Sequence, residues 1–397
     1  MIHSPEAFDL PQLNRQFNEA FDKQANNSPV AFHAPGRVNL IGEHTDYTGG
    51  MVFPCAIDRG TLLLIRRNRS KRFRFASTNF TLTANLALEE INQVQSDSWA
   101  NYPLGVIDQF RQRGIDIDGI DCLYSGNVPN GAGLSSSASI EVVTAFAINA
   151  LFNANLDILE LVKLSQAAEN EFVGMQCGIM DQFAVAMGKP DHAVRLNCQS
   201  LDYRHVPLNL DDHAIVLANT NQRRELNSSA YNDRVKECQR ALTLVQQKLP
   251  VNTLGELSSD ELATTIDLFK DNDTAYQRAR HITSENARVV SAVETLEQND
   301  LTTFGKLMQQ SHASLRDDYA VSSDPLDTMV NLAMEHNGVL GARLTGAGFG
   351  GCTVNLMQQQ AVPTFLETVG KHYHDKTGLT ADFYTIKPSG GVSEYSQ

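Results

Sequence analysis

A glycine- and serine-rich turn that leads directly into a long apolar run restricts the possible folds of this chain more than any other feature. It is the stretch GNVPNGAGLSSSASIEVVTAFAINALF, residues 126 to 152. Gly131 and Gly133 let backbone amides come close to an anion, and the serines add hydroxyl groups where a helix should begin. Since a helix start presents unpaired N–H groups and a partial positive charge, the stretch predicts a phosphate-binding loop.

This stretch is not the common P-loop. No segment of the chain matches the pattern G-x-x-x-x-G-K-[ST], so a phosphate loop that carries a lysine is excluded. A glycine and serine turn before a helix is often only structural, and from these residues alone that interpretation stays open.

Length and composition limit the class of protein. A chain of 397 residues exceeds one ordinary hydrophobic core and predicts two domains. With 42% hydrophobic and 20% charged residues, it has the composition of a soluble globular protein. The net charge of −14 argues against a nucleic-acid partner, because phosphate backbones are bound chiefly by Lys and Arg.

One basic segment is the exception to the acidic balance. It reads LLLIRRNRSKRFRFAS, residues 62 to 77. Such a patch can bind nucleic acid or a nucleotide. The same residues are also typical of a β-hairpin that turns near Asn68 to Ser70 and exposes its cations to solvent, which is the interpretation we favour.

The sequence predicts a cytoplasmic protein. The N-terminal segment has acidic residues and no continuous apolar core, so we do not expect a signal peptide. No apolar run approaches the ~18 residues of a membrane span. The six cysteines form no C-x-x-C pair and fit neither a zinc site nor a disulfide framework, so we expect free thiols.

A second segment is rich in polar side chains. It reads VAFHAPGRVNLIGEHTDYTGGMVFPCAIDRGTLLLI, residues 30 to 65, in which glycines interrupt strand-like residues. Its polar side chains are Arg37, Glu43, His44, Asp46 and Tyr47. Carboxylates and an imidazole can hydrogen-bond the hydroxyl groups of a sugar. A metal cluster and a charged surface loop remain alternatives, although the Glu-His-x-Asp spacing matches no known metal motif.

Two further carboxylates stand near predicted helix ends. Residues 156 to 174 have helical apolar spacing, with Glu169 and Glu171 in the C-terminal part. The helix dipole disfavours carboxylates there, which indicates a nearby cation, although an exposed helix residue is the simpler interpretation. Asp181 lies where a helix through Met187 should begin, a position that also suits a helix cap.

Four motifs together resemble the GHMP small-molecule kinases, and galactokinases in particular. The segment APGRVNLIGEHTDYTGG is similar, nearly letter for letter, to the galactokinase signature, and GLSSSAS resembles the phosphate loop of that family. The match resumes at NEFVGMQCGIMDQFAVAMGK and again at RLTGAGFGGCTVNL, in the family's order. In the last motif Ala347 stands where some relatives carry glycine, so a positive φ there would strain the loop.

The resemblance implies an α+β fold of two domains. The N-terminal domain would be a ribosomal-S5-like α/β unit and the C-terminal one a ferredoxin-like α+β unit, with the active site in the cleft between them. The sequence changes character near residue 210, which predicts domains over 1–210 and 211–397. In the second half we expect helices near 228–248, 258–269, 274–298, 301–315, 324–336 and 361–378, and strands near 338–345, 351–357 and 380–388.

The resemblance also implies a reaction and a set of site residues. The γ-phosphoryl group of MgATP would pass to the anomeric hydroxyl of α-D-galactose, giving galactose 1-phosphate and ADP in the first committed step of galactose catabolism. Asp181 would accept the hydroxyl proton, with Arg37 beside it. Mg²⁺ would be bound by Ser137 and Glu169. The residues that would bind the sugar are Glu43, His44, Thr45, Asp46, Gly178 and Tyr231. Those that would bind the phosphates are Gly131, Ala132, Gly133, Leu134, Ser135, Ser136 and Ser137.

Partners and alternatives complete the expectation. The resemblance implies galactose and ATP as the only partners, with no nucleic acid, no membrane and a monomeric chain. Trp99, the only tryptophan, would either stack on the nucleotide base or pack in the core. Two other functions remain open: a kinase for a related sugar such as N-acetylgalactosamine, and a non-catalytic sensor of galactose and ATP.

Overall fold

The computed structural model describes residues 7–21, 27–68, 70–81, 83–91, 98–129, 132–222, 227–269 and 273–396. Gly131, predicted to bind phosphate, lies outside these residues, and so does Arg69 of the basic segment.

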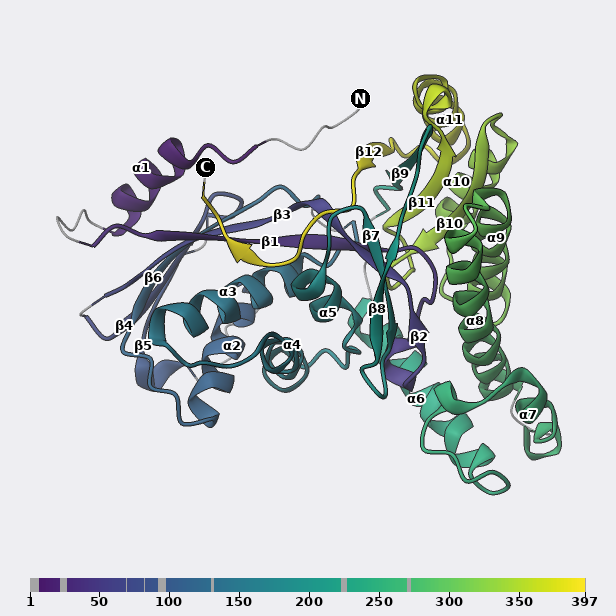
Figure 1. Ribbon diagram of the computed structural model, residues 1–397, viewed down its shortest axis with the longest axis horizontal. Helices are drawn as coiled ribbons and strands as arrows, with labels where there is room; N and C mark the ends of the chain where they lie inside the picture. Colours follow the sequence, from purple (N-terminus) through teal and green to yellow (C-terminus); the bar gives the residue numbers. More distant parts are fainter. Residues whose placement is uncertain are drawn as a thin grey trace.

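A six-stranded sheet organises the first half of the chain, with strands in the order β13-β1-β3-β6-β4-β5. Neighbouring strands are antiparallel except β4 and β6, which are parallel. Helix α1 covers one face and helices α2 to α5 cover the other (Figure 1). The strands are β1 (Val30–Asn39), β3 (Pro54–Arg67), β4 (Arg72–Ser77), β5 (Ala84–Ala87), β6 (Ile120–Gly126) and β13 (Ser393–Glu394). The helices are α1 (Leu10–Phe21), α2 (Asn101–Gln112), α3 (Ser136–Phe152), α4 (Ile158–Ala167) and α5 (Met180–Met187).

The predicted hairpin in the basic segment is wrong. Strands β3 and β4 are not neighbours, because β6 lies between them. The fully buried carboxylate of Asp121 on β6 accepts hydrogen bonds from Arg66 Nε of β3 at 2.9 Å and from Arg74 Nε of β4 at 2.7 Å. These two cations are therefore neutralised within the sheet rather than exposed to solvent.

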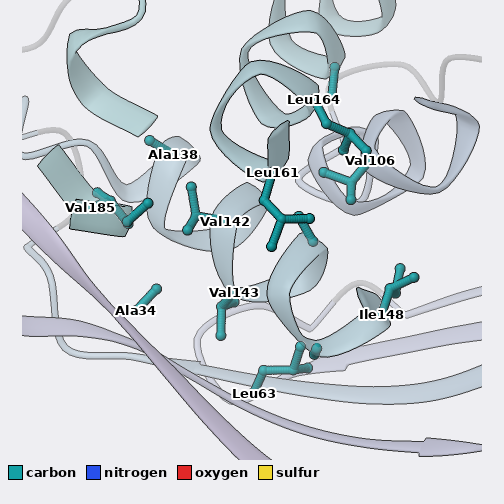
Figure 2. Packing of buried hydrophobic residues seen from close by; sticks show 14 of the residues in the cluster. Ala34, Leu63, Val106, Ala138, Val142, Val143, Ile148, Leu161, Leu164 and Val185 are labelled. Atoms are coloured by element: carbon teal, nitrogen blue, oxygen red, sulfur yellow. The ribbon is translucent and has the colours of Figure 1, made fainter. Parts of the chain in front are cut away.

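Helix α3 is the centre of the first core. It is apolar around most of its circumference, which is typical of a helix covered on several sides. Figure 2 shows Val143 on the side facing Leu63 of β3, whereas Val142 lies toward Leu161 of α4. Burying each such side chain contributes about 1.5–3 kcal/mol. This packing fixes the helix start, where the serines lie.

A four-stranded antiparallel sheet, in the order β10-β11-β9-β12, organises the second half. Its strands are β9 (His213–Asn219), β10 (Val339–Thr345), β11 (Cys352–Gln358) and β12 (Asp382–Ile386). The helices of this half that the sequence predicts correctly are α6 (Asn227–Val245), α8 (Asp273–Glu297), α9 (Leu301–Asp317), α10 (Asp324–Glu335) and α11 (Val362–Thr377). The domain boundary near residue 210 precedes β9 and stays a prediction, while β13 returns the C-terminal end to the first sheet (Figure 1).

One predicted helix of this half is wrong. Instead of a continuous helix over 258–269, the chain forms α7 (Ser259–Ala263) and the short 3₁₀ helix η5 (Ile266–Phe269). Between them the hydroxyls of Thr264 and Thr265 donate to the carbonyls three residues earlier. Such local bonds compete with a continuous helix.

The remaining elements are short. A three-stranded sheet contains β2 (Met51–Val52), β7 (His192–Asn197) and β8 (Tyr203–Pro207). Single turns are η1 (Asp46–Thr48), η2 (Leu88–Glu90), η4 (Leu254–Glu256) and η6 (Gln359–Ala361), and η3 (Ala168–Val173) is a π-helix. All six cysteines are free. Within the described ranges, we find no helix with the length and apolarity that crossing a membrane requires.

Candidate active site

A cavity of about 250 Å³ lies at the start of α3 and is lined by residues from both halves of the chain. Most of the predicted site residues meet there. The lining consists of Arg37, Glu43, His44, Asp46, Gly133, Leu134, Ser135, Ser136, Ser137, Glu169, Met175, Cys177, Met180, Asp181, Tyr231, Gly346 and Ala347. Three other predicted residues do not line the cavity, although each is adjacent in sequence to a residue that does: Ala132, Thr45 and Gly178.

An ion pair joins Arg37 on β1 to Asp181 in the first turn of α5. Arg37 Nε donates to Asp181 Oδ1 at 2.9 Å, and Nη2 donates to Oδ2 at 3.0 Å. The third guanidinium nitrogen, Nη1, donates to the carbonyl of Gly133 at 2.6 Å. Ser135 Oγ also donates to Asp181 Oδ2, at 2.5 Å. The carboxylate is thus fixed from two sides directly beside the serine loop.

The serine loop leads into α3 through a left-handed residue. Ser135 has φ 58° and precedes the helix without a side-chain cap. Two glycines lie very close to the loop backbone. A Cβ on Gly36 would lie 2.7 Å from the Leu134 carbonyl oxygen, and a Cβ on Gly346 would lie 2.8 Å from the Gly133 carbonyl oxygen. Ser135, Ser136 and Ser137 line the cavity where α3 begins, and a helix start with its unpaired N–H groups suits an anion.

Glu169 lies on the π-helix η3, where the sequence predicts an α-helix. Such π-turns are frequent at functional sites. Glu169 Oε2 accepts from Gln182 Nε2 at 2.7 Å, and its carboxyl also hydrogen-bonds Ser137. Burial raises the pKa of Glu169 to about 6.

The surroundings of Glu169 fit a hard cation. Glu141 is fully buried beside it, and among the residues that the structure describes Glu141 Oε1 has no partner at hydrogen-bond geometry. Gln182 Nε2 donates to Glu141 Oε2 at 3.0 Å as well. Across the described part of the chain, no cluster of three or more His, Cys, Asp or Glu forms a self-sufficient metal site. An ion bound by Ser137 and Glu169 would need further oxygen ligands, which suits Mg²⁺ with phosphate and water.

The segment from Glu43 to Asp46 forms a second wall. Glu43 Oε2 accepts from Arg343 Nη2 at 2.7 Å. The His44 ring contacts the Ala347 carbonyl through Nε2 at 3.1 Å and the Tyr47 hydroxyl through Nδ1 at 2.9 Å. Thr45 is fully buried, and its hydroxyl bonds main-chain carbonyls of the same loop. Thr45 therefore shapes the loop rather than facing the cavity.

Asp46 and Gly178 are in close contact. A Cβ added to Gly178 would lie 2.2 Å from Asp46 Oδ2, so only glycine leaves room for this carboxyl. Burial, together with the nearby carboxylates of Asp181 and Glu43, raises the pKa of Asp46 to about 7. Tyr231 on α6 completes the wall, with its ring 5.5 Å from that of His44.

Ala347 does not strain the glycine loop. The loop residues with positive φ are Gly346, Gly348, Phe349, Gly350 and Gly351. Because the backbone of Ala347 is not left-handed, its side chain has no conformational cost there.

A second cavity of about 120 Å³ adjoins the start of α3. Ser136 and Ser137 line both cavities. Aromatic side chains form much of the second one: Phe80, Trp99, Tyr102 and Tyr124. Trp99 stacks on Phe80 at 6.5 Å between ring centroids and meets Tyr124 edge-on at 5.4 Å. Trp99 is thus partly in the core and partly at the wall of a cavity of a size and character suited to a flat ring.

Sequence reasoning missed Arg343. It is fully buried on β10, where it donates to the Asn39 carbonyl at 2.9 Å and to Glu43. A signal was available, since an arginine within the apolar strand pattern GVLGARLT indicates a buried charge with a partner. The partner itself is some 300 positions away in the chain, at Glu43.

The fold, with the serine loop at the start of α3, defines the class of protein, a GHMP small-molecule kinase. Family models agree: residues 101–189 match the GHMP kinases N terminal domain and residues 292–375 match the GHMP kinases C terminal domain. A mevalonate kinase crystal structure superposes with a TM-score of 0.62 over 90% of this chain and 99% of that one, at 20% identity, and shows the shared fold alone.

Residues 15–67 match the galactokinase galactose-binding signature. The chain is 46% identical to the galactokinase of Clostridium acetobutylicum over 97% of this chain and 99% of that protein. It is 46% identical to the Bacillus subtilis galactokinase over 91% of this chain and 94% of that one. The crystal structure of Lactococcus lactis galactokinase complexed with galactose superposes with a TM-score of 0.94, at 41% identity, over 98% of this chain and 100% of that one. The chain belongs to the galactokinase family, so the predicted family and fold class are confirmed.

Proposed function

We propose that this protein is a galactokinase, which transfers the γ-phosphoryl group of ATP to the anomeric hydroxyl of α-D-galactose. The observation that carries the proposal is the Arg37–Asp181 pair, bonded to the serine loop on one side and facing the Glu43–Asp46 segment across one cavity. Phosphoryl transfer depends mainly on alignment and charge stabilisation, which this arrangement supplies.

In the reaction, the anomeric oxygen of the sugar forms a bond to the γ-phosphorus while the bond from that phosphorus to the ADP oxygen breaks. Asp181 accepts the hydroxyl proton. Arg37 orients the Asp181 carboxylate through two hydrogen bonds and adds positive charge beside the transferring group. Glu43, His44, Asp46 and Tyr231 orient the sugar, while Gly178 leaves room for the Asp46 carboxyl.

The nucleotide lies along the start of α3. The loop from Ala132 to Ser137 binds the phosphates through backbone N–H groups and hydroxyls. Ser137 and Glu169 would hold Mg²⁺, which neutralises phosphate charge when it is bound. The second cavity, with Trp99 at its wall, accepts the adenine ring.

Further parts of the proposal concern the whole protein. We assign two domains, 1–210 and 211–397, which meet at the cavity. The acidic net charge and the six free cysteines support a cytoplasmic enzyme that acts on small molecules. We expect a monomer.

The decisive experiment measures ADP release with galactose, N-acetylgalactosamine and glucose, together with direct detection of the sugar 1-phosphate. We expect release with galactose and loss of at least a hundredfold in turnover for Asp181→Ala, with galactose binding retained. Release with N-acetylgalactosamine alone would assign the related kinase activity. Binding of both ligands without ADP release would assign the sensor.

A further inference from the structure

The His44 ring is held by two partners within the protein. Nε2 lies 3.1 Å from the carbonyl oxygen of Ala347, and Nδ1 lies 2.9 Å from the hydroxyl of Tyr47. A carbonyl oxygen can only accept, so Nε2 must carry the hydrogen. Burial lowers the pKa of His44 to about 3, so the ring is neutral. Nδ1 then has a lone pair and accepts the hydrogen of the Tyr47 hydroxyl.

The same logic fixes the direction of a longer chain of hydrogen bonds. Because Tyr47 donates to His44, its oxygen accepts from the hydroxyl of Tyr319 at 2.7 Å. The Tyr319 oxygen in turn accepts from the Cys238 thiol at 3.1 Å. The chain therefore runs from Cys238 through both tyrosines to His44 and ends at the Ala347 carbonyl. Reversing any link would place two donors or two acceptors against each other.

Tyr319 is rigidly placed. Its side chain is fully buried, and its ring lies between those of His44 at 4.9 Å and His281 at 4.5 Å. Its carbonyl accepts from Arg234 Nη1 at 3.2 Å. Burial raises the pKa of the Tyr319 hydroxyl well above its usual value, so it remains a donor. Satisfied buried networks of this kind restrict the orientations of their members.

Neighbouring elements hold the same cluster. Cys238 is on α6, seven residues after Tyr231, so both lie on one side of that helix. His281 on α8 donates from Nε2 to the Glu43 carbonyl at 3.0 Å. Helices of the second half thus reach the sugar-facing segment of the first half through this cluster. Neither Tyr47 nor Tyr319 lines the main cavity.

We infer that Tyr319, acting through Tyr47, is a positioning residue for sugar recognition: it fixes the orientation of the His44 ring at the cavity wall, with Nδ1 bonded to Tyr47 and Nε2–H bonded to the Ala347 carbonyl. This inference rests on the proposed function. Both ring nitrogens of His44 are then bonded within the protein, so the ring contributes a fixed surface to the cavity wall rather than a free N–H. With a weaker hydrogen bond at Nδ1, the His44 ring would be less restrained and this part of the cavity wall would change shape.

The experiment replaces Tyr319 by Phe, which keeps the ring and removes the hydroxyl. We expect the galactose KM to rise about threefold to tenfold, with kcat and the ATP KM within about twofold of wild type. Tyr47→Phe removes the direct donor to His44 and should have at least the same effect, so it replaces Tyr319→Phe should that variant not fold. Tyr373→Phe is the matched control, because this buried tyrosine donates to the Thr220 carbonyl away from the cavity.

A second measurement is independent of turnover. Nitrogen-15 NMR of protein labelled at histidine, with His44 identified from the His44→Asn variant, should show the Nε2–H form in wild type and a shifted Nδ1 signal in Tyr319→Phe, where Tyr47 donates a weaker hydrogen bond. In the His44→Asn background, Tyr319→Phe should leave the galactose KM unchanged.

The outcomes separate the two proposals. Unchanged galactose KM and unchanged His44 signals in Tyr319→Phe would overturn this inference and leave the kinase activity standing. A parallel loss of kcat and of both substrate affinities would also overturn it, since that pattern marks a general structural role. Absence of galactose-dependent ADP release in wild type would instead overturn the proposed function, while the NMR comparison would still test the hydrogen-bond chain from Tyr319 to His44.

Discussion

At the scale of single residues, Asp46 gives the site a pH dependence. Burial raises the pKa of its carboxyl to about 7, so the group is mostly neutral at pH 6 and mostly ionised at pH 8. The ionised form accepts hydrogen bonds from sugar hydroxyls more strongly. We therefore expect the galactose KM to fall as pH rises from 6 to 8, measured in steady-state assays at saturating ATP.

The control for this pH dependence is Asp46→Asn, which cannot ionise and should flatten the profile. Glu169, whose pKa burial raises to about 6, titrates in an overlapping range. Because Glu169 is assigned to Mg²⁺ and ATP rather than to the sugar, its titration should change the ATP KM. The assay therefore measures the galactose KM and the ATP KM at each pH. A galactose KM in Asp46→Asn that still falls as in wild type would show that another group is responsible.

Substituting Gly178 tests whether the position of the Asp46 carboxyl matters for galactose binding. The Cβ of Gly178→Ala would lie 2.2 Å from Asp46 Oδ2, so the carboxyl must move. We expect the galactose KM to rise about tenfold or more, since small displacements of positioning groups have large effects. Gly390→Ala is the control, because its Cβ would meet only ordinary contacts at 3.8 Å. Equal galactose KM values for the two variants would contradict the assigned role of Gly178.

At the scale of elements, Asp121 holds three strands together. It is fully buried on β6 and accepts from Arg66 of β3 and Arg74 of β4. Asp121→Asn removes the counter-charge of the buried Arg66 and of the partly exposed Arg74, so we expect the free energy of unfolding to fall by about 3–5 kcal/mol. Asp118→Asn breaks a single exposed pair with Arg67 and should cost at most about 1 kcal/mol. Urea unfolding compares them, and equal losses would contradict this account.

Apolar periodicity in the sequence predicts some of these elements and not others. Helices with a clear apolar face, such as α8 and α9, follow from periodicity alone, because their buried residues recur at helical spacing. The order of β3, β6 and β4 does not, since β6 joins its neighbours from about 50 residues further along the chain. The π-turn that carries Glu169 also escapes periodicity, because it depends on one extra residue within an otherwise helical run.

At the scale of the whole molecule, the sequence motifs identify most of the residues that line the first cavity, but not the residues that hold those side chains in position. Arg37, Asp181 and the serines stand in recognisable segments, and they do line one cavity. Tyr319 bonds Tyr47 and Arg343 bonds Glu43 only because distant parts of the chain fold against this segment. The strand pattern indicates that Arg343 is buried, but a single sequence carries no signal of the distant residues with which Arg343 and Tyr319 pair.

Arg343 joins the two halves through buried charge. From β10 it donates to Glu43 Oε2 at 2.7 Å and to the Asn39 carbonyl at 2.9 Å, and both side chains are almost fully buried. Arg343→Leu leaves Glu43 as an unpaired buried carboxylate, so we expect the free energy of unfolding to fall by about 3–5 kcal/mol. Urea unfolding measures this loss, and the galactose KM should rise with it because Glu43 faces the cavity.

The double variant Glu43→Gln with Arg343→Leu separates charge from packing. The lower stability expected for Arg343→Leu would come from the Glu43 carboxylate, buried without its cation. Neutralising Glu43 should then restore about 0.5–3 kcal/mol of the free energy of unfolding, since the two residues are in direct contact. Galactose affinity should stay low, because the amide is a weaker acceptor than the carboxylate. A double variant as unstable as the sum of both single variants would mean that the pair contributes through shape alone, and that the halves are held together elsewhere.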